Sequence, residues 1–338
     1  MKILKSILIL LVVVIIGIFG FSMTIDGKYD SSAQLSMNAS PSTIQGIVSD
    51  LTTWENWGVW QLSDPTGDYN YSDPASGQGA WYTWAGDSMG SGKLTIMELG
   101  ENSMATKVEF DGQGESNGYW KFEPREDGTT MVTWGMNGEM GAMGKAMFAI
   151  FMGTTDIDGS MDEMAGKDFT GGLANLKVIA ENTEMASKID VEETTVAALD
   201  YYSITETLKI SEMDSMFFGR MFGELMGYLG PEAGANMTGM PFAIYHKWDP
   251  ENDETTIEVA VAVNSDMEET ERIKKGKTHE GNVLKAVKTG TYETEEEHNG
   301  LYAYLQLHGK EMIGSPWEIF ATDPTVEEIV VEVYYPVK

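Results

Sequence analysis

The sequence predicts an α+β protein with two domains behind one apolar N-terminal segment. Residues 7–21 are almost uninterrupted Ile, Leu, Val, Gly and Phe. Between residues 31 and 181, segments in which apolar residues recur at every second position, as in strands, occur together with segments of helical spacing. Between residues 191 and 338, a strand–helix–strand–strand unit occurs twice. At 338 residues, the chain is long enough for two domains that each bury their own core.

Residues 1–27 are expected to form an uncleaved membrane anchor, with a cleaved secretory signal as the alternative. Lys2 and Lys5 precede the apolar run, and no small-x-small cleavage site follows it. The run is short for a spanning helix, which needs about 20 residues, but residues 22–25 can extend it. The two lysines place the N-terminus inside the cell. We therefore expect one transmembrane helix and extracytoplasmic domains in a single-pass membrane protein.

The composition excludes several kinds of site and partner. The chain has no cysteine, so disulfides, thiolate catalysis and cysteine-based metal sites are ruled out. Its four histidines show no metal-ligand spacing, so no metal or cofactor is expected. The net charge of −31 repels phosphate backbones, and the basic run at 272–277 is flanked by glutamates. No nucleic-acid partner is therefore expected.

The pattern between residues 31 and 181 is that of a single α+β domain. A strand near 31–37 is followed by a helix that ends near Asp50, a succession of short strands, and a long helix near 159–180. In the segment 104–110, apolar side chains alternate with Lys107 and Glu109, which is typical of an antiparallel sheet with one buried face. We expect a curved sheet that wraps one helix.

Tryptophans concentrate in this first domain. Trp54, Trp57 and Trp60 recur at helical spacing, and Trp134 lies on an expected strand. Such indoles either fill a core or line the mouth of a cavity, where they supply apolar area and an N–H donor. Trp57, Trp60 and Trp134 are therefore candidate ligand-binding residues, with the core role as the alternative.

Four segments of this domain, taken as an ordered set, resemble the START-like SRPBCC superfamily of polyketide cyclase/dehydrase type. They are residues 48–57, 77–82, 132–134 and 167–177. The resemblance implies a helix-grip fold with a deep apolar cavity between the sheet and the C-terminal helix. Members of the superfamily include lipid carriers and cyclases, so the fold alone does not define a function.

Residues 182–190 are expected to be a polar linker, and residues 191–338 contain the internal repeat. Each copy has a strand that begins at a proline, at 241–250 in the first and 316–324 in the second. Each copy then closes on a strand with alternating apolar residues. Two such copies predict a pseudo-twofold domain with a cleft between its halves.

This second half resembles the GyrI-like effector-binding domains in residues 288–292, 316–324 and 333–337. In that family, an acidic residue of the second repeat reaches the cleft and pairs with cationic aromatic ligands. The resemblance places this acid at Glu318, with Tyr292 and Trp317 as aromatic walls. Ala243 holds the equivalent position in the first repeat, where Tyr245 completes the candidate site. A solvated strand residue is the alternative role for Glu318.

Two cavity folds together predict a membrane-anchored protein that binds apolar or cationic small molecules, as a sensor or a scavenger. GyrI-like regulators carry a DNA-binding domain, whereas a cavity domain and an apolar segment precede the repeat here. An enzyme of cyclase or hydrolase type that uses Glu318 with Tyr292 is an alternative, although no Ser-His-Asp arrangement is visible. A module that docks a protein partner with a basic surface is another alternative.

Overall fold

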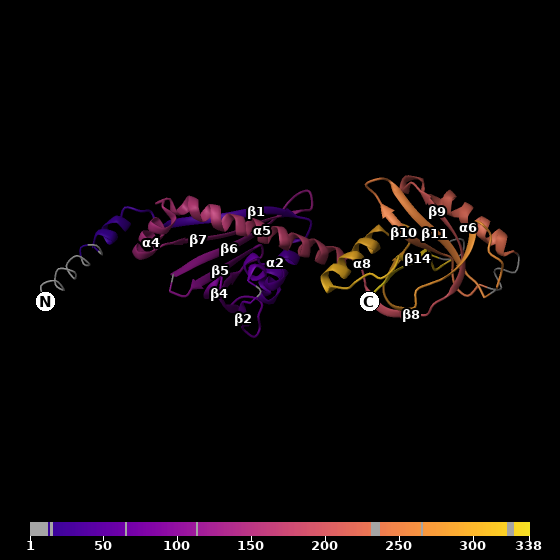
Figure 1. Cartoon of the computed structure of the whole chain (residues 1–338), viewed down its shortest axis with the longest axis horizontal. Helices are drawn as coiled ribbons and strands as arrows, with labels where there is room; N and C mark the ends of the chain where they lie inside the picture. Colours follow the sequence, from indigo (N-terminus) through magenta and orange to yellow (C-terminus); the bar gives the residue numbers. More distant parts are fainter. Residues whose placement is uncertain are drawn as a thin grey trace. The chain divides into compact units, whose positions relative to one another are not determined.

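The computed structural model describes residues 13, 16–64, 66–112, 114–230, 237–264, 266–322 and 328–338 (Figure 1). The chain divides into two compact units, Met1–Glu184 and Met185–Lys338. Each unit contains helices and one antiparallel sheet, which confirms the predicted α+β class.

The first unit has a seven-stranded sheet in the order β1-β7-β6-β5-β4-β3-β2. The strands are β1 (Lys28–Met37), β2 (Asp68–Tyr71), β3 (Trp81–Gly86), β4 (Gly90–Leu99), β5 (Ser103–Phe110), β6 (Gly114–Pro124) and β7 (Thr130–Glu139). The helices are α2 (Pro41–Ser49), the 3-10 helix η1 (Leu51–Asn56), α3 (Val59–Ser63), α4 (Ala142–Met152) and α5 (Ile157–Ala186). The long helix α5 runs along one face of the sheet and buries Phe169, Leu173 and Leu176 (Figure 1).

The helices of this unit begin where the sequence provides a cap. Ser40 precedes α2, and its hydroxyl accepts a hydrogen bond from the Thr43 N–H at 3.2 Å, while Pro41 occupies the first turn. Asp50 in turn accepts a hydrogen bond from the N–H of Thr52 at 3.1 Å and starts η1. These two caps place the tryptophan-rich segment directly after α2.

Tryptophan side chains build the core of the first unit. The rings of Trp120 and Trp134 stack with their centroids 4.6 Å apart. Trp57 meets both of these rings edge-on, at 6.0 and 5.7 Å. Trp54 packs against Trp57 at 4.7 Å, and each of the four side chains is at most 4% exposed. Stacked and edge-to-face contacts of this kind are the arrangements that aromatic rings prefer, so the four indoles pack against one another.

The expected transmembrane helix is not found. Among the described residues, no helix is long and apolar enough to cross a membrane. Residues 1–12, 14 and 15 of the predicted anchor lie outside the described residues. The finding contradicts the predicted single-pass membrane protein with extracytoplasmic domains.

The second unit has an eight-stranded sheet in the order β12-β9-β11-β10-β14-β15-β13-β8. The strands are β8 (Glu192–Val196), β9 (Asp200–Leu208), β10 (Phe242–Asp249), β11 (Glu254–Ala262), β12 (Ile273–Lys277), β13 (Gly281–Thr289), β14 (Trp317–Phe320) and β15 (Val330–Pro336). The helices are the 3-10 helix η2 (Ile210–Glu212), α6 (Ser215–Leu229) and α8 (Glu295–His308).

The order of elements in this unit repeats, as the sequence predicts. The first copy runs β9, α6, β10 and β11, and the second runs β13, α8, β14 and β15. Strands β10 and β14 are antiparallel neighbours at the centre of the sheet, and Ala243 pairs with Glu318. Because these two residues hold equivalent positions in the two copies, the local pseudo-twofold axis passes through their pair.

Helices α6 and α8 cover the same face of the sheet. Strand pairing puts Ala243, Val259, Glu318 and Val333 in one row across four strands, so their side chains share a face. Val259 belongs to the apolar cluster under α6, and Val333 belongs to the cluster under α8. The central strands β10 and β14 therefore form a floor between the two helices.

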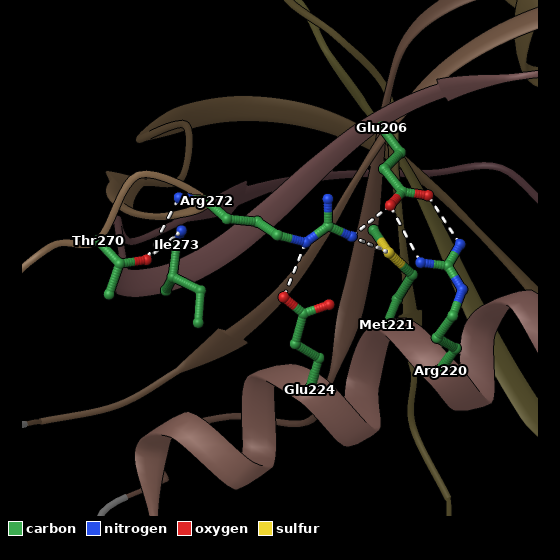
Figure 2. A network of polar contacts seen from close by, with 7 residues as sticks. All are labelled: Glu206, Arg220, Met221, Glu224, Thr270, Arg272 and Ile273. Atoms are coloured by element: carbon green, nitrogen blue, oxygen red, sulfur yellow. Dashed lines mark hydrogen bonds and ion pairs between the residues drawn. The ribbon is translucent and has the colours of Figure 1, made fainter.

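An ionic network ties α6 to the sheet (Figure 2). Arg220 of α6 donates two hydrogen bonds to the carboxylate of Glu206 on β9, at 3.0 and 2.8 Å. Arg272 also donates to Glu206, and its Nε donates to Glu224 of α6 at 2.7 Å. The hydrogen bonds from Arg220 and Arg272 lower the pKa of Glu206 to about 2.

The packing of α5 on the tryptophan cluster can be tested with two neighbouring glycines. A Cβ atom at Gly172 would lie 2.5 Å from the Trp134 ring, whereas one at Gly171 would lie 3.5 Å from Val59. We expect Gly172→Ala to lower the free energy of unfolding by about 1–3 kcal/mol through this clash. Gly171→Ala should instead raise it by up to about 1 kcal/mol through helix propensity. Denaturant unfolding followed by tryptophan fluorescence distinguishes them, and equal effects would contradict this packing.

The ionic network can be tested through its pH dependence. Because the folded state lowers the pKa of Glu206, the ionised carboxylate stabilises the fold above its ordinary pKa, and this contribution disappears as pH falls from about 4.5 to about 2. Glu206→Gln should therefore cost about 1–3 kcal/mol at pH 7, and the loss relative to wild type should shrink over that window. Urea unfolding at several pH values measures it. The control is Glu254→Gln, which removes an exposed ion pair with Lys247 and should change little.

Candidate functional site

A cavity of about 2340 Å³ opens between α6 and α8 in the second unit. Strands β10 and β14 contribute its floor, and the segment 291–294 before α8 contributes to its wall. Its apolar lining includes Phe218, Phe222, Tyr245, Tyr292, Tyr302 and Phe320. Both copies of the repeat therefore contribute to one cavity.

Phe320 is the centre of the aromatic wall. Its ring lies edge-on to Phe218 at 5.9 Å and to Phe222 at 5.8 Å, both on α6. Tyr292, which belongs to the second copy of the repeat like Phe320 itself, approaches the same ring at 6.1 Å and is 48% exposed. The wall thus combines rings from α6, from β14 and from the segment before α8.

Glu318 lies on the floor of this cavity and is only 4% exposed. Its carboxylate accepts hydrogen bonds from the Tyr245 hydroxyl at 2.6 Å, from His298 Nε2 at 2.9 Å and from the Thr294 hydroxyl. Thr294 and His298 are four residues apart at the start of α8, so they face the same side of the helix. Tyr335 extends the cluster, because its hydroxyl lies 3.0 Å from His298 Nδ1.

Burial and hydrogen bonding oppose each other in setting the pKa of Glu318. Burial raises this pKa, but the hydrogen bonds and charge of His298, together with the hydroxyls of Thr294 and Tyr245, outweigh burial and hold it below its ordinary value. Burial and the charge of Glu318 raise the pKa of Tyr245 well above its ordinary value. At neutral pH the cluster therefore holds a carboxylate surrounded by protonated donors.

The cavity lining as a whole is negatively charged. Its acidic side chains are Asp214, Glu293, Glu295, Glu296 and Glu318, and its lysines are Lys188, Lys247 and Lys288. Lys288 is already paired, with Glu296 at 3.3 Å and Glu297 at 3.2 Å. The potential in the cavity therefore favours a positively charged ligand.

The structure brings three of the four candidate residues of the second half together. Glu318, Tyr245 and Tyr292 all line the cavity. Trp317 does not line it, because successive residues of a strand point to opposite faces. Its ring stacks on Tyr334 at 5.1 Å in a separate apolar cluster. Phe320 occupies the wall position that was expected for Trp317.

Of the three candidate tryptophans of the first half, Trp57 and Trp134 lie in the core of the first unit, and Trp60 is partly buried against that core. Trp57 and Trp134 are 0% and 4% exposed within the tryptophan cluster. Trp60 packs edge-on against Trp134 at 5.5 Å, and its indole N–H donates to Asp168 at 2.9 Å. Their contacts are those of the core alternative.

Thr294, His298 and Tyr335 are site residues that the sequence analysis missed. The spacing of Thr294 and His298, one helical turn apart at a helix start, is a signal that could have suggested them. Tyr335 offered no local signal beyond its place on the closing strand. Within the described part of the chain, no group of three or more His, Asp or Glu is arranged to hold a metal ion.

No family model matches the chain, and no curated protein matches it. Several solved structures are similar to part of it. The C-terminal domain of EcmrR is 16% identical, over 44% of this chain and 98% of that chain, with a TM-score of 0.35. EcmrR in a complex with DNA is 13% identical, over 57% and 76%, with a TM-score of 0.40. Protein CV1439 from Chromobacterium violaceum is 11% identical, over 45% and 96%, with a TM-score of 0.32.

Because their TM-scores are all below 0.5, these similarities carry no argument about this chain, and the GyrI-like resemblance of residues 191–338 stays a prediction. At such identities and TM-scores they assign neither a ligand nor an activity to this chain. The DNA belongs to the EcmrR complex, and the absence of a nucleic-acid partner stays a prediction for this chain. Membership of the first unit in the START-like superfamily also stays a prediction.

The role of His298 can be tested by its coupling to Glu318. His298→Asn removes a donor from the buried carboxylate, so the pKa of Glu318 should rise and the fold should lose about 1–3 kcal/mol at pH 7. Once Glu318→Gln has removed the charge, the same change at His298 should cost much less. Urea unfolding of the two single variants and the double variant, followed by circular dichroism, measures this coupling. Additive losses would mean that His298 acts independently of Glu318.

Proposed function

We propose that the second unit is a small-molecule-binding domain whose cavity takes organic cations with an aromatic or apolar body. The observation that carries this proposal is the buried carboxylate of Glu318, with its three side-chain hydrogen-bond donors, at the floor of an aromatic cavity. Either role expected from the sequence, sensor or scavenger, requires this binding step.

The charge of the ligand follows from the cost of burying Glu318. A buried carboxylate is stabilised by hydrogen bonds and by an opposite charge. Three side chains already donate to Glu318, and a carboxylate can accept about four hydrogen bonds, so its acceptor capacity is not exhausted. A cation that binds there gains Coulomb attraction in a site of low dielectric constant.

The shape and chemistry of the cavity support a ligand with a large apolar body. Pockets for drug-sized molecules typically enclose about 300–1,000 Å³, and this cavity is larger, at about 2340 Å³. Met213, Met237 and Met240 also line it, and flexible thioether side chains can adjust to ligands of different shape. Aromatic rings such as Phe320 and Tyr292 attract a delocalised cation through their π faces. We therefore expect several related cations to bind, rather than a single one.

The proposal predicts that binding of an aromatic cation depends on Glu318. Rhodamine 6G, titrated into the full-length chain and followed by fluorescence anisotropy, is a suitable probe. Glu318→Gln should weaken its binding at least about tenfold, which corresponds to about 1.4 kcal/mol. Nile red, a neutral dye, should lose much less affinity in the same variant.

The matched control is Glu332→Gln, which makes the same substitution on the next strand. Glu332 pairs with Ile319 in the register, so it lies on the opposite face from Glu318, where it binds Lys285 at 2.6 Å. This control should bind rhodamine 6G as wild type does. Binding that Glu318→Gln leaves unchanged would contradict the role of the carboxylate, and failure of both dyes to bind wild type would overturn the proposed function.

A further inference from the structure

A serine, a histidine and a glutamate form a hydrogen-bonded chain at the cavity, away from the Glu318 cluster. Ser315 Oγ lies 3.1 Å from His246 Nδ1, and His246 Nε2 lies 2.6 Å from Glu258 Oε2. Ser315 and His246 line the cavity, whereas Glu258 lies behind them and is 9% exposed. An accessible hydroxyl, a histidine and a buried acid in this order are the components of a hydrolytic triad.

A β-bulge brings His246 into this position. The pairing of β10 with β11 joins Tyr245 to Ile257 and Lys247 to Thr256, so His246 is an extra residue on β10. On a regular strand, Tyr245 and His246 would point to opposite faces. A bulge re-aims the side chain it carries, and both residues line the same cavity here.

Glu258 is held in place as an ion. The hydroxyl of Ser203 donates to Glu258 Oε1 at 2.5 Å, while Oε2 faces His246. Burial raises the pKa of Glu258, but hydrogen bonds from His246 and Ser203 and the charge of His246 lower it below its ordinary value. In the neutral form of His246 that a general base requires, the carboxylate of Glu258 favours a proton on Nε2, so the lone pair of Nδ1 faces the Ser315 hydroxyl.

Backbone donors are also present beside the serine. Within the described residues, neither the Gly314 N–H nor the Ser315 N–H donates a backbone-to-backbone hydrogen bond. As the backbone donors next to Ser315 in the chain, these two groups are the candidates to hold an oxyanion in an acyl-transfer reaction. Backbone N–H groups in this role stabilise the tetrahedral intermediates of acyl transfer.

We propose that Ser315, His246 and Glu258 form a hydrolytic site for carboxylic esters with an apolar acyl or aryl group. Ser315 and His246 are the catalytic residues, and Glu258 is a positioning residue that acts through His246. The apolar part of the ester would occupy the aromatic cavity. The site uses none of the residues that hydrogen bond to Glu318, so it goes beyond the proposed cation binding and does not depend on it.

The reaction requires only the ester and water. Ser315 Oγ attacks the carbonyl carbon while His246 Nδ1 takes the hydroxyl proton. The tetrahedral intermediate collapses, the bond to the leaving alcohol breaks, and His246 gives its proton to the departing oxygen. Water then attacks the acyl-serine with His246 again as the base, and collapse of the second intermediate releases the carboxylic acid and restores Ser315. Glu258 stays ionised throughout and stabilises the imidazolium.

Hydrolysis of 4-nitrophenyl butyrate by the full-length chain tests the proposal. Ser315→Ala and His246→Ala should each lower kcat/KM at least about 100-fold. Ser211→Ala is the matched control, because Ser211 lies outside the cavity, where its hydroxyl donates to Asp253 at 2.7 Å. Glu258→Gln should lower kcat at least about tenfold and leave KM nearly unchanged, since it disturbs only the orientation and charge of His246. A change in packing alone would not produce that split.

Covalent labelling supplies a second measurement that does not depend on turnover. A fluorophosphonate probe should label wild type at Ser315, as located by mass spectrometry of peptides, and should leave Ser315→Ala unlabelled at that peptide. Circular dichroism establishes that the variant is folded. Undiminished hydrolysis by Ser315→Ala would overturn the proposal. So would a wild-type chain that neither hydrolyses the ester nor reacts with the probe at Ser315.

Discussion

The burial of one carboxylate, that of Glu318, is the constraint on which the second unit depends. A charged group taken out of water costs several kcal/mol unless donors surround it. The donors come from both copies of the repeat: Tyr245 from β10 of the first, and Thr294 and His298 from α8 of the second. The acid therefore links a strand of one copy to a helix of the other, and the cavity lies where these elements meet.

The duplication explains why this acid occurs once. Ala243 lies directly opposite Glu318 across the central pair of strands. An acid at both positions would set two carboxylates face to face in a site of low dielectric constant, where only one could ionise. A methyl group opposite Glu318 avoids that repulsion and leaves the floor of the cavity open. The asymmetry between the copies is thus a physical requirement of placing a charge on a pseudo-twofold axis.

The sequence predicted the α+β class and the repeat, because strand alternation and helical periodicity are local signals. It did not reveal which side chains surround Glu318, since Thr294 and His298 reach it only through the packing of α8 on the sheet. Trp317 shows a different limit, because a sequence motif does not state which face of a strand each of its residues occupies. The period of a strand does state it: Trp317 and Glu318 are consecutive, so they point to opposite faces. The apolar N-terminal run has the composition of an anchor, but no helix among the described residues is long and apolar enough to cross a membrane.

The proposed hydrolytic site depends on one inserted residue of β10, whereas the proposed cation binding at Glu318 does not. In a regular ladder, the side chain after Tyr245 would lie wholly on the face that carries Glu258 and Trp317, away from the cavity. The bulge at His246 instead allows this side chain to contact Glu258 on one side and Ser315 at the cavity on the other. A bulge leaves a residue unpaired in the ladder and so carries a local cost. At this bulge, the hydrogen bonds of His246 connect the two faces of the sheet.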